Sequence, residues 1–164
     1  MKKKEIELKF LIDPKYLTKI SNLSSKTILI TQGYFDISDN MRIRTECSDG
    51  VNEGYLSIKG ERDGDARDEY TYEIPYQEAF ELIKVFTCYR VFKTRHIVND
   101  KKDCWEIDVF HGDNTGLIIA ELEIPYEDYD VKKPAWIDDW KLVYDDDKFY
   151  NFNLARHPYS NWER

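Results

Sequence analysis

Acidic and basic residues at every second position carry the chemical signal of this sequence, and they begin with its first segment, EIELKF. Alternate side chains of an extended strand point to opposite faces, so Glu5, Glu7 and Lys9 share one face. Charged side chains gathered on one face of a strand are either solvated or form a working surface. The segment is therefore either an ordinary strand with a solvated face or one part of a binding surface.

The same alternation returns along the rest of the chain. The later charged positions are Arg42, Arg44, Lys59, Arg67, Glu69, Glu73, Lys93, Arg95, Glu106, Asp108, Glu121 and Glu123. With the first segment included, these faces carry eight acidic and seven basic residues. Solvated faces normally include Ser, Thr, Asn and Gln, whereas these faces concentrate Glu, Arg and Lys. The arginine pair of the segment RIR suits bidentate recognition of phosphate.

Two arrangements of these faces fit the pattern. In a β-sandwich, the apolar faces meet in the core and the charges are solvated. In a barrel that closes with its charges inward, helices cover the apolar exterior. An interior of mixed charge is costly when it is empty of partners, but not when it holds water, divalent cations and a multiply charged anion.

Turn signals separate eight segments that we predict as strands, which is enough to close a barrel. These segments are residues 5–10, 27–37, 41–47, 54–60, 67–74, 89–98, 103–110 and 116–124. Asp13 and Pro14 make a favourable N-cap and first turn, and they predict a helix over residues 14–23. Apolar spacing predicts a second helix over residues 76–86, and the tail predicts a short helix before Pro158. We expect residues 1–164 to form a single domain.

Composition excludes several classes of protein. The formal net charge of −8 argues against non-specific binding of nucleic acid, although it leaves room for a local basic site. The sequence contains no apolar run of transmembrane length and no signal-peptide pattern after MKKK, so we expect no membrane partner. Three cysteines without CxxC spacing fit a reduced, cytoplasmic protein better than a disulfide framework or a zinc site.

The opening EIELK resembles the ExExK signature of the CYTH, or triphosphate tunnel metalloenzyme, superfamily. Later segments resemble the motifs of that family in the same order: QGY, RIR, LSIKG, YEI, KTR, WEIDVFHG, AELEI and DDDKFYNFNLA. The resemblance covers almost the whole chain. It implies an α+β fold that is mainly antiparallel β, with an eight-stranded closed β-barrel forming a tunnel, external helices and a C-terminal helix near one mouth. It also implies that the tunnel binds a triphosphate and Mg2+ or Mn2+.

The resemblance assigns roles to individual residues of this sequence. The expected phosphate contacts are Lys9, Arg42, Arg44, Lys59, Lys93, Arg95 and, by a weaker match, Lys148. The expected metal ligands are Glu5, Glu7, Glu121 and Glu123, with Glu106 and Asp108 close to them or in their second shell. Glu5, Glu7 and Lys93 are the expected catalytic residues. The fifth strand reads EYTYE where many members carry a tighter ExE, so either Glu69 or Glu73 is its tunnel acid.

The function that the resemblance favours is metal-dependent hydrolysis of a triphosphate. Inorganic tripolyphosphate is the leading substrate, because the sequence contains no obvious motif that would recognise a nucleobase. Three alternatives stay open: an adenylate cyclase of the class IV type, a thiamine-triphosphate or nucleoside triphosphatase, and a polyphosphate- or nucleotide-binding module without turnover. The acidic pairs of the first and eighth strands disfavour the last of these, since a simple anion binder would benefit from losing them. The oligomeric state stays open, a homodimer included.

Overall fold

A single antiparallel sheet dominates the computed structural model, which describes residues 6–36, 38–63, 66–126, 128–143 and 145–162. Its strands are β1 (Ile6–Ile12), β2 (Lys26–Phe35), β3 (Ser38–Ser48), β4 (Val51–Asp63), β5 (Ala66–Ile74), β6 (Tyr89–Asp100), β7 (Asp103–Phe110), β8 (Ile118–Ile124) and β9 (Trp140–Leu142). The α-helices are α1 (Leu17–Leu23), α2 (Tyr76–Phe86) and α3 (Asn151–Arg156). Short 3-10 turns cover Pro14–Tyr16, Gly112–Asn114, Asp147–Phe149 and Tyr159–Asn161.

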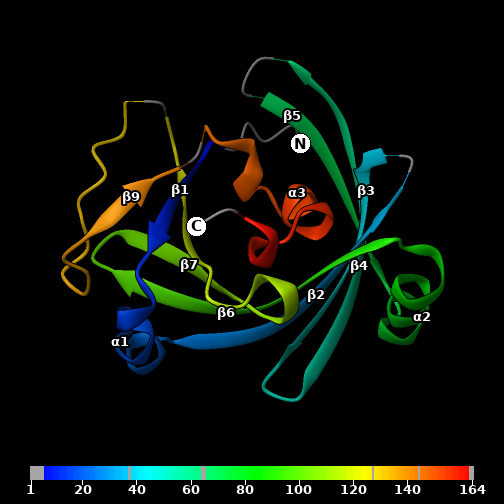
Figure 1. Ribbon diagram of the computed structural model, residues 1–164, viewed down its shortest axis with the longest axis horizontal. Helices are drawn as coiled ribbons and strands as arrows, with labels where there is room; N and C mark the ends of the chain where they lie inside the picture. The colour runs from blue at the N-terminus through cyan, green and yellow to red at the C-terminus, as the bar shows by residue number, and fades with distance from the viewer. Residues whose placement is uncertain (1–5, 37, 64–65, 127, 144, 163–164) are drawn as a thin grey trace.

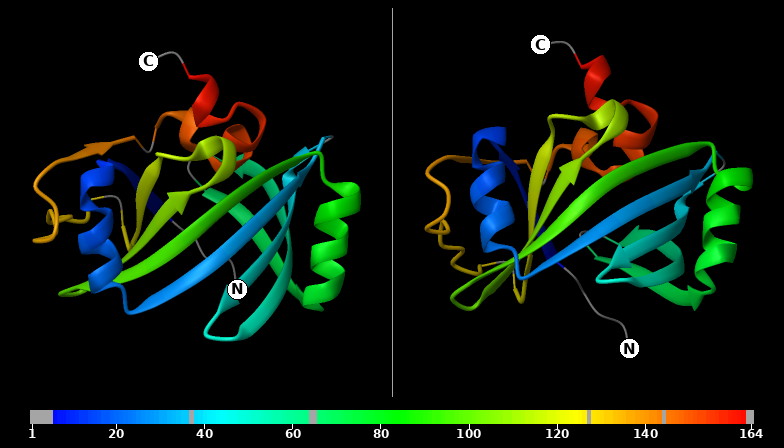
Figure 2. Two further views of the ribbon diagram at one scale, coloured as in Figure 1. Left: turned by 60° about the horizontal axis from the view of Figure 1, so that its bottom comes forward. Right: turned by 90° about the horizontal axis from the view of Figure 1, so that it is seen from below.

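The strands follow the order β5-β4-β3-β2-β6-β7-β8-β1-β9, so the first strand of the chain inserts between two of the last. The sheet curls strongly around α3 (Figures 1 and 2). The predicted mainly antiparallel, barrel-like fold is confirmed, but its closure differs from the expected ring. Within the described residues the hydrogen-bonded ladder ends at β5 and β9, and the short β9 is a strand that the alternation did not predict.

Local sequence signals explain the helices. Asp13 accepts a hydrogen bond from the backbone amide of Lys15 at 2.9 Å, and Pro14 opens the first turn, as a helix start requires. The predicted helix over residues 14–23 therefore forms, although its first turn is a 3-10 turn and only Leu17–Leu23 is α-helical. The helix α2 has the predicted bounds. In the described ranges, no helix is long and apolar enough to cross a membrane.

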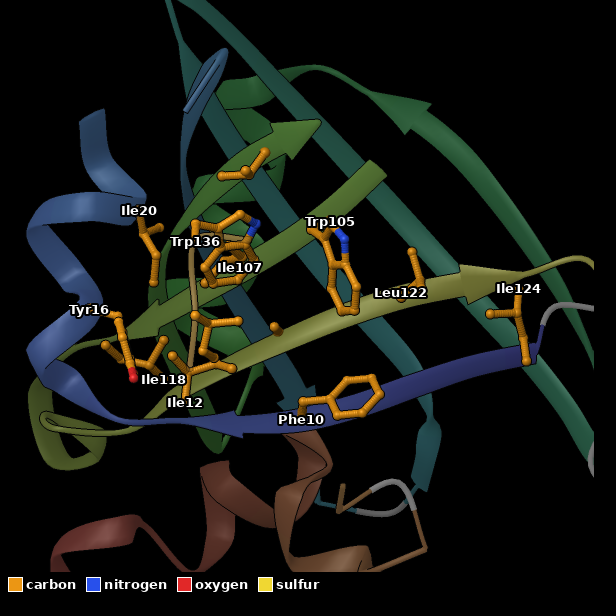
Figure 3. Close-up of a cluster of buried hydrophobic side chains, with 13 residues drawn as sticks. Phe10, Ile12, Tyr16, Ile20, Trp105, Ile107, Ile118, Leu122, Ile124 and Trp136 are labelled. Atoms are coloured by element: carbon orange, nitrogen blue, oxygen red, sulfur yellow. The ribbon is translucent and has the colours of Figure 1, made fainter. Parts of the chain in front are cut away.

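The outer face of the sheet carries the apolar residues of the alternating pattern. The largest buried cluster joins Phe10, Trp105 and Ile107 from the sheet to Ile20 of α1 and to Trp136 of the loop before β9 (Figure 3). A smaller cluster packs Ala79 and Ile83 of α2 against Ile43 of β3. The helices α1 and α2 and the loop before β9 thus cover part of the apolar side from outside, and the charged side faces the interior of the curl.

A third buried cluster lies on the inner face, where α3 covers one end of the strands. Cross-strand register places Tyr34, Val91, Phe110 and Ile119 on the same face as the charged residues. These side chains pack against Leu154 of α3 and against further residues of the tail. The inner face is therefore divided between a charged stretch and an apolar end sealed by the C-terminal segment, as the resemblance implied for a C-terminal helix near one mouth.

Candidate active site

Strand register brings the predicted charges together on the inner face. Residues directly opposite each other in an antiparallel pair project from the same side of the sheet. The register pairs Lys9 with Glu121, Arg95 with Asp108, and Lys59 with Glu69. Figure 1 shows that β1 and β7 lie on one side of the curl and β4 and β5 on the other. The charges accordingly form two groups that face each other across the interior.

The first group, here named the acidic wall, comes from β1, β6, β7 and β8. Its members are Glu7, Lys9, Lys93, Arg95, Glu106, Asp108, Glu121 and Glu123. Arg95 is its centre, because the guanidinium contacts three carboxylates. It donates to Asp108 at 2.7 and 2.8 Å and to Glu121 at 2.7 Å, and it also pairs with Glu106. Asp108 is fully buried, and the hydrogen bonds from Arg95 satisfy both of its carboxylate oxygens.

Lys9 links β1 to this network by pairing with both Glu7 and Glu121. Burial opposes ionisation of Glu121, but the charges of Lys9, Lys93 and Arg95 outweigh that effect and lower its pKa. Glu121 is therefore ionised although it is buried. It joins the two cations Lys9 and Arg95 into one continuous cluster.

Lys93 is the most deeply buried cation of the acidic wall, with 2% of the residue exposed. Its ammonium donates to Asp108 at 2.5 Å and to the side-chain oxygen of Asn151 at 3.4 Å. Burial lowers the pKa of Lys93, and the charge of Asp108 acts in the opposite direction. Asn151 is the first residue of α3, so the C-terminal helix contributes directly to this cluster.

The second group, here named the arginine wall, consists of Arg42, Arg44, Lys59 and Glu69 on β3, β4 and β5. Glu69 bridges two cations, with oxygens 3.1 Å from Arg42 Nη2 and 3.0 Å from Lys59 Nζ. Arg44 Nε lies 3.0 Å from Glu46, and its guanidinium stands over the Tyr55 ring at 5.2 Å. The Nε atoms of Arg42 and Arg44 are buried and make no hydrogen bond to the part of the chain that the structure describes. These guanidinium groups retain donor capacity for a ligand.

Between the two walls, β2 contributes polar residues to which the sequence assigned no role. Gln32 is 1% exposed and donates to the Tyr34 hydroxyl at 3.0 Å. Burial raises the pKa of Tyr34 to about 12, partly against the neighbouring charge of Arg42. The signal was present in the motif QGY, because Gln32 and Tyr34 alternate on the inner face of a strand whose other inward residues are apolar. Asn151 gave no comparable signal.

Other predicted residues lie elsewhere or outside the described residues. Glu5 falls in the undescribed N-terminal residues. Lys148 is exposed and contacts Asp146, Phe149 and Trp162, so its recorded contacts lie within the tail rather than with the two walls. Glu123 is opposite Glu7 and exposed. In β5, Glu69 reaches the cations, whereas Glu73 is exposed and lies opposite Tyr55.

The acidic wall has the donor chemistry of a site for a hard divalent cation. Carboxylate oxygens are the ligands that Mg2+ and Mn2+ prefer, and Glu7, Glu106, Asp108 and Glu121 gather around the cations Lys9, Lys93 and Arg95. Across the described residues, no three His, Cys, Asp or Glu side chains are already arranged around one metal position. The carboxylates instead point toward Lys9 and Arg95, so metal binding requires some of them to turn. The type of ligand fits, and the described residues implied for it, Glu7, Glu121 and Glu123, lie on the paired strands β1 and β8.

Comparison with known proteins identifies the family to which the chain belongs. The model of the CYTH domain matches residues 3–144. An inorganic triphosphatase of Acetivibrio thermocellus is 37% identical over 164 residues, which is 98% of this chain and 98% of that protein.

Solved structures share the curled sheet. A crystal structure of an inorganic triphosphatase is 27% identical, covers 92% of this chain and 97% of its own, and superposes with a TM-score of 0.60. A Hippeastrum protein with dominant triphosphatase activity is 19% identical over 74% of this chain and 80% of its own, with a TM-score of 0.57, and this similarity shows the fold alone. The match of the family model and the identity over the full length agree, and the chain belongs to the CYTH domain family.

Proposed function

We propose that this protein hydrolyses a triphosphate, with inorganic tripolyphosphate as substrate, in the charged interior between the two walls. The observation that carries the proposal is the pairing of a carboxylate cluster with two arginines whose buried Nε atoms have no hydrogen-bond partner within the described residues. The first can hold a metal and the second can hold phosphate oxygens. The full-length similarity to an inorganic triphosphatase supports the same reaction and substrate.

Phosphate binding falls to the cations of both walls. Arg42 and Arg44 offer forked donors that match phosphate oxygens, and Lys59 adds a point charge from β4. Lys9, Lys93 and Arg95 face them from the acidic wall, so a linear polyanion placed between the walls has cations on both sides. Lys148 is not needed for this arrangement, and we assign it no role in binding.

Metal binding falls to the carboxylates of the acidic wall. CYTH triphosphatases depend in general on a metal, and we assign this one Mg2+ or Mn2+ because its donors are carboxylate oxygens. Glu7, Glu121 and Glu123 would hold the ion, together with Glu5. Glu106 and Asp108 are held against Arg95 and would orient the ligands from behind. A bound divalent cation neutralises phosphate charge and supplies a more acidic water.

Lys93 is placed to stabilise charge that develops in the reaction. Its ammonium is fixed by Asp108 and Asn151, so it need not reorganise when a bridging oxygen acquires negative charge. Burial keeps bulk water away from this ammonium, which strengthens its interaction with an anion. Lys93 thus acts as an electrostatic catalyst in this proposal, in addition to binding phosphate.

The decisive experiment measures phosphate release from tripolyphosphate with Mg2+ and with Mn2+. We expect the wild-type protein to release phosphate, and Glu7→Gln to lower kcat by at least about a hundredfold because a metal ligand is lost. Glu81→Gln, on the outer helix α2, is the matched control for the change of charge and should behave as wild type. Equal rates for the wild type and Glu7→Gln would remove the metal role of Glu7. Parallel reactions with ATP and thiamine triphosphate rank the substrates, and formation of cyclic AMP from ATP would identify a cyclase instead.

A further inference from the structure

Two cations of the arginine wall share one anion of the chain itself, the Glu69 carboxylate. One oxygen accepts from Arg42 at 3.1 Å, and the other pairs with Lys59 at 3.0 Å. These cations come from different strands, so the carboxylate joins β3 and β4 from its position on β5. A phosphate group offers the same pair of acceptor oxygens to such donors. Glu69 therefore occupies the place at which the structure is best suited to receive a phosphate of the substrate.

Neighbouring hydroxyl groups support the carboxylate in this position. Thr71 Oγ1 lies 3.5 Å from Glu69, and it is 3.0 Å from the buried hydroxyl of Ser57. Ser57 faces Arg42 on one side and Thr71 on the other, since the register places all three in one row across β3, β4 and β5. The Lys59 and Arg42 charges lower the pKa of Glu69 against the opposing effect of burial, so the group is an anion at neutral pH.

The Glu69 pair can nevertheless open, unlike the Arg95–Asp108 pair of the acidic wall. The side chains of Glu69 and Lys59 are each 29% exposed, whereas the Asp108 side chain beside Arg95 is fully buried. A partly exposed carboxylate that loses its partners gains hydration from water, which limits the cost of displacing it. A displaced Asp108 would instead be left buried without compensation.

We propose that Glu69 is a specificity-determining residue that acts as a tethered competitor for the phosphate site formed by Arg42 and Lys59. This inference rests on the proposed function and names the anions that the site accepts. A tripolyphosphate carries enough charge, spread over several contacts, to displace the carboxylate. Orthophosphate can contact only the cations in this one region, so it displaces the Glu69 carboxylate poorly. Glu69 thereby excludes abundant monophosphates and weakens retention of the orthophosphate product.

The test is a binding measurement in EDTA, which separates anion binding from metal and from turnover. Isothermal titration calorimetry of tripolyphosphate and of orthophosphate compares the wild type with Glu69→Gln, using Glu81→Gln as the control for net charge. We expect Glu69→Gln to bind both anions about tenfold more tightly, the size expected for a lost charge-assisted competitor. The gain in affinity should be larger for orthophosphate than for tripolyphosphate. The preference of the protein for tripolyphosphate over orthophosphate should therefore decrease. Inhibition of hydrolysis by orthophosphate should increase in parallel.

Several outcomes would overturn the proposal. Unchanged or weaker binding by Glu69→Gln would do so, and so would an equal gain in Glu81→Gln, which would reduce the effect to net charge. A higher Mg2+ requirement in Glu69→Gln would show a metal ligand rather than a competitor. Glu69→Asp keeps the charge, but its side chain is one methylene too short to span both cations. It should therefore tighten the binding of both anions less than Glu69→Gln does. This variant provides the test if Glu69→Gln does not fold. If the wild-type protein does not hydrolyse tripolyphosphate, the proposed function is refuted. The binding measurements would still test whether Glu69 competes with anions.

Discussion

The acidic wall and the arginine wall differ in how completely their buried charged groups are paired. In the acidic wall, Arg95 contacts three carboxylates and Lys9 contacts two. In the arginine wall, Arg42 and Lys59 share one carboxylate, and two guanidinium nitrogens are buried without a hydrogen-bond partner among the described residues. One side of the interior is thus a network of ion pairs, and the other has guanidinium nitrogens without hydrogen bonds among the described residues.

This difference indicates which wall supports the fold and which wall mainly receives the substrate. The ion pairs around the buried Asp108 and Glu121 hold the strands of the acidic wall together without a ligand. Guanidinium nitrogens that are buried without a hydrogen bond carry a desolvation cost that a bound anion would offset. Burial lowers the pKa of Arg44, and the positive charge of Arg42 lowers it further. The arginine wall is accordingly the part of the site that gains most from a bound polyanion.

The largest effect should come from removing the centre of the acidic wall. Arg95→Met leaves Glu106, Asp108 and Glu121 without their shared cation. We expect a loss of about 3–5 kcal/mol in the free energy of unfolding, as for other broken buried networks, together with loss of activity. Arg42→Met should cost about 1 kcal/mol or less, because its partner Glu69 is partly exposed. Urea denaturation of the two variants measures the difference, and equal costs would contradict the distinction between the walls.

Metal binding should have an intermediate effect on the free energy of unfolding. This effect should depend on the acidic wall alone. Mg2+ at a hundredfold excess over its Kd is expected to raise the free energy of unfolding by about 2.7 kcal/mol, the value for a ligand that binds only the folded state. Thermal unfolding with EDTA and with Mg2+ measures this gain for each variant. Glu121→Gln should abolish the gain, whereas Glu69→Gln should retain it. A gain that survives in Glu121→Gln but not in Glu69→Gln would place the metal on the other wall.

The smallest effect should come from a conservative change in the arginine wall. Arg44→Lys keeps the charge but loses the forked donors and the buried Nε. We expect KM for tripolyphosphate to rise by about tenfold, with kcat unchanged and stability within about 0.5 kcal/mol of the wild type. Steady-state kinetics and a denaturation curve on the same preparation check both halves of this prediction. A large loss of stability would show that Arg44 supports the fold rather than the ligand.

Alternation along single strands was sufficient to predict most of the inner face. A strand has only two faces, so Glu7 and Lys9 on β1, or Glu106 and Asp108 on β7, could be assigned to one face from local sequence. The family resemblance then supplied the barrel-like arrangement of the strands, which local sequence does not contain. The same alternation could not choose between Glu69 and Glu73, because both have the same parity, and only their neighbours across β4 distinguish them.

Contacts made by the tail were the least predictable part. Asn151 reaches Lys93 across 58 positions of sequence, and no periodicity connects the two residues. Lys148 matched a basic position of the family, yet a 3-10 turn over Asp147–Phe149 directs it to its neighbours in the tail. The closure of the sheet also escaped prediction, because alternation specifies faces but not which edges find a hydrogen-bonding partner.

The insertion of β1 between β8 and β9 has a consequence for how the protein is made. Lys9 and Glu121 are separated by 112 positions, whereas Arg42 and Glu69 are separated by 27. Local hairpins can form while synthesis is still in progress, but contacts between distant segments carry the entropy of closing a long loop. A ribosome-bound chain can thus form the hairpins of β2 to β5 early. The strand β1 cannot pair with β8 until β8 has left the ribosome. A fragment that ends before Ile118 would have the arginines but no Glu121 to bind Lys9, so this protein acquires its acidic wall late in its own synthesis.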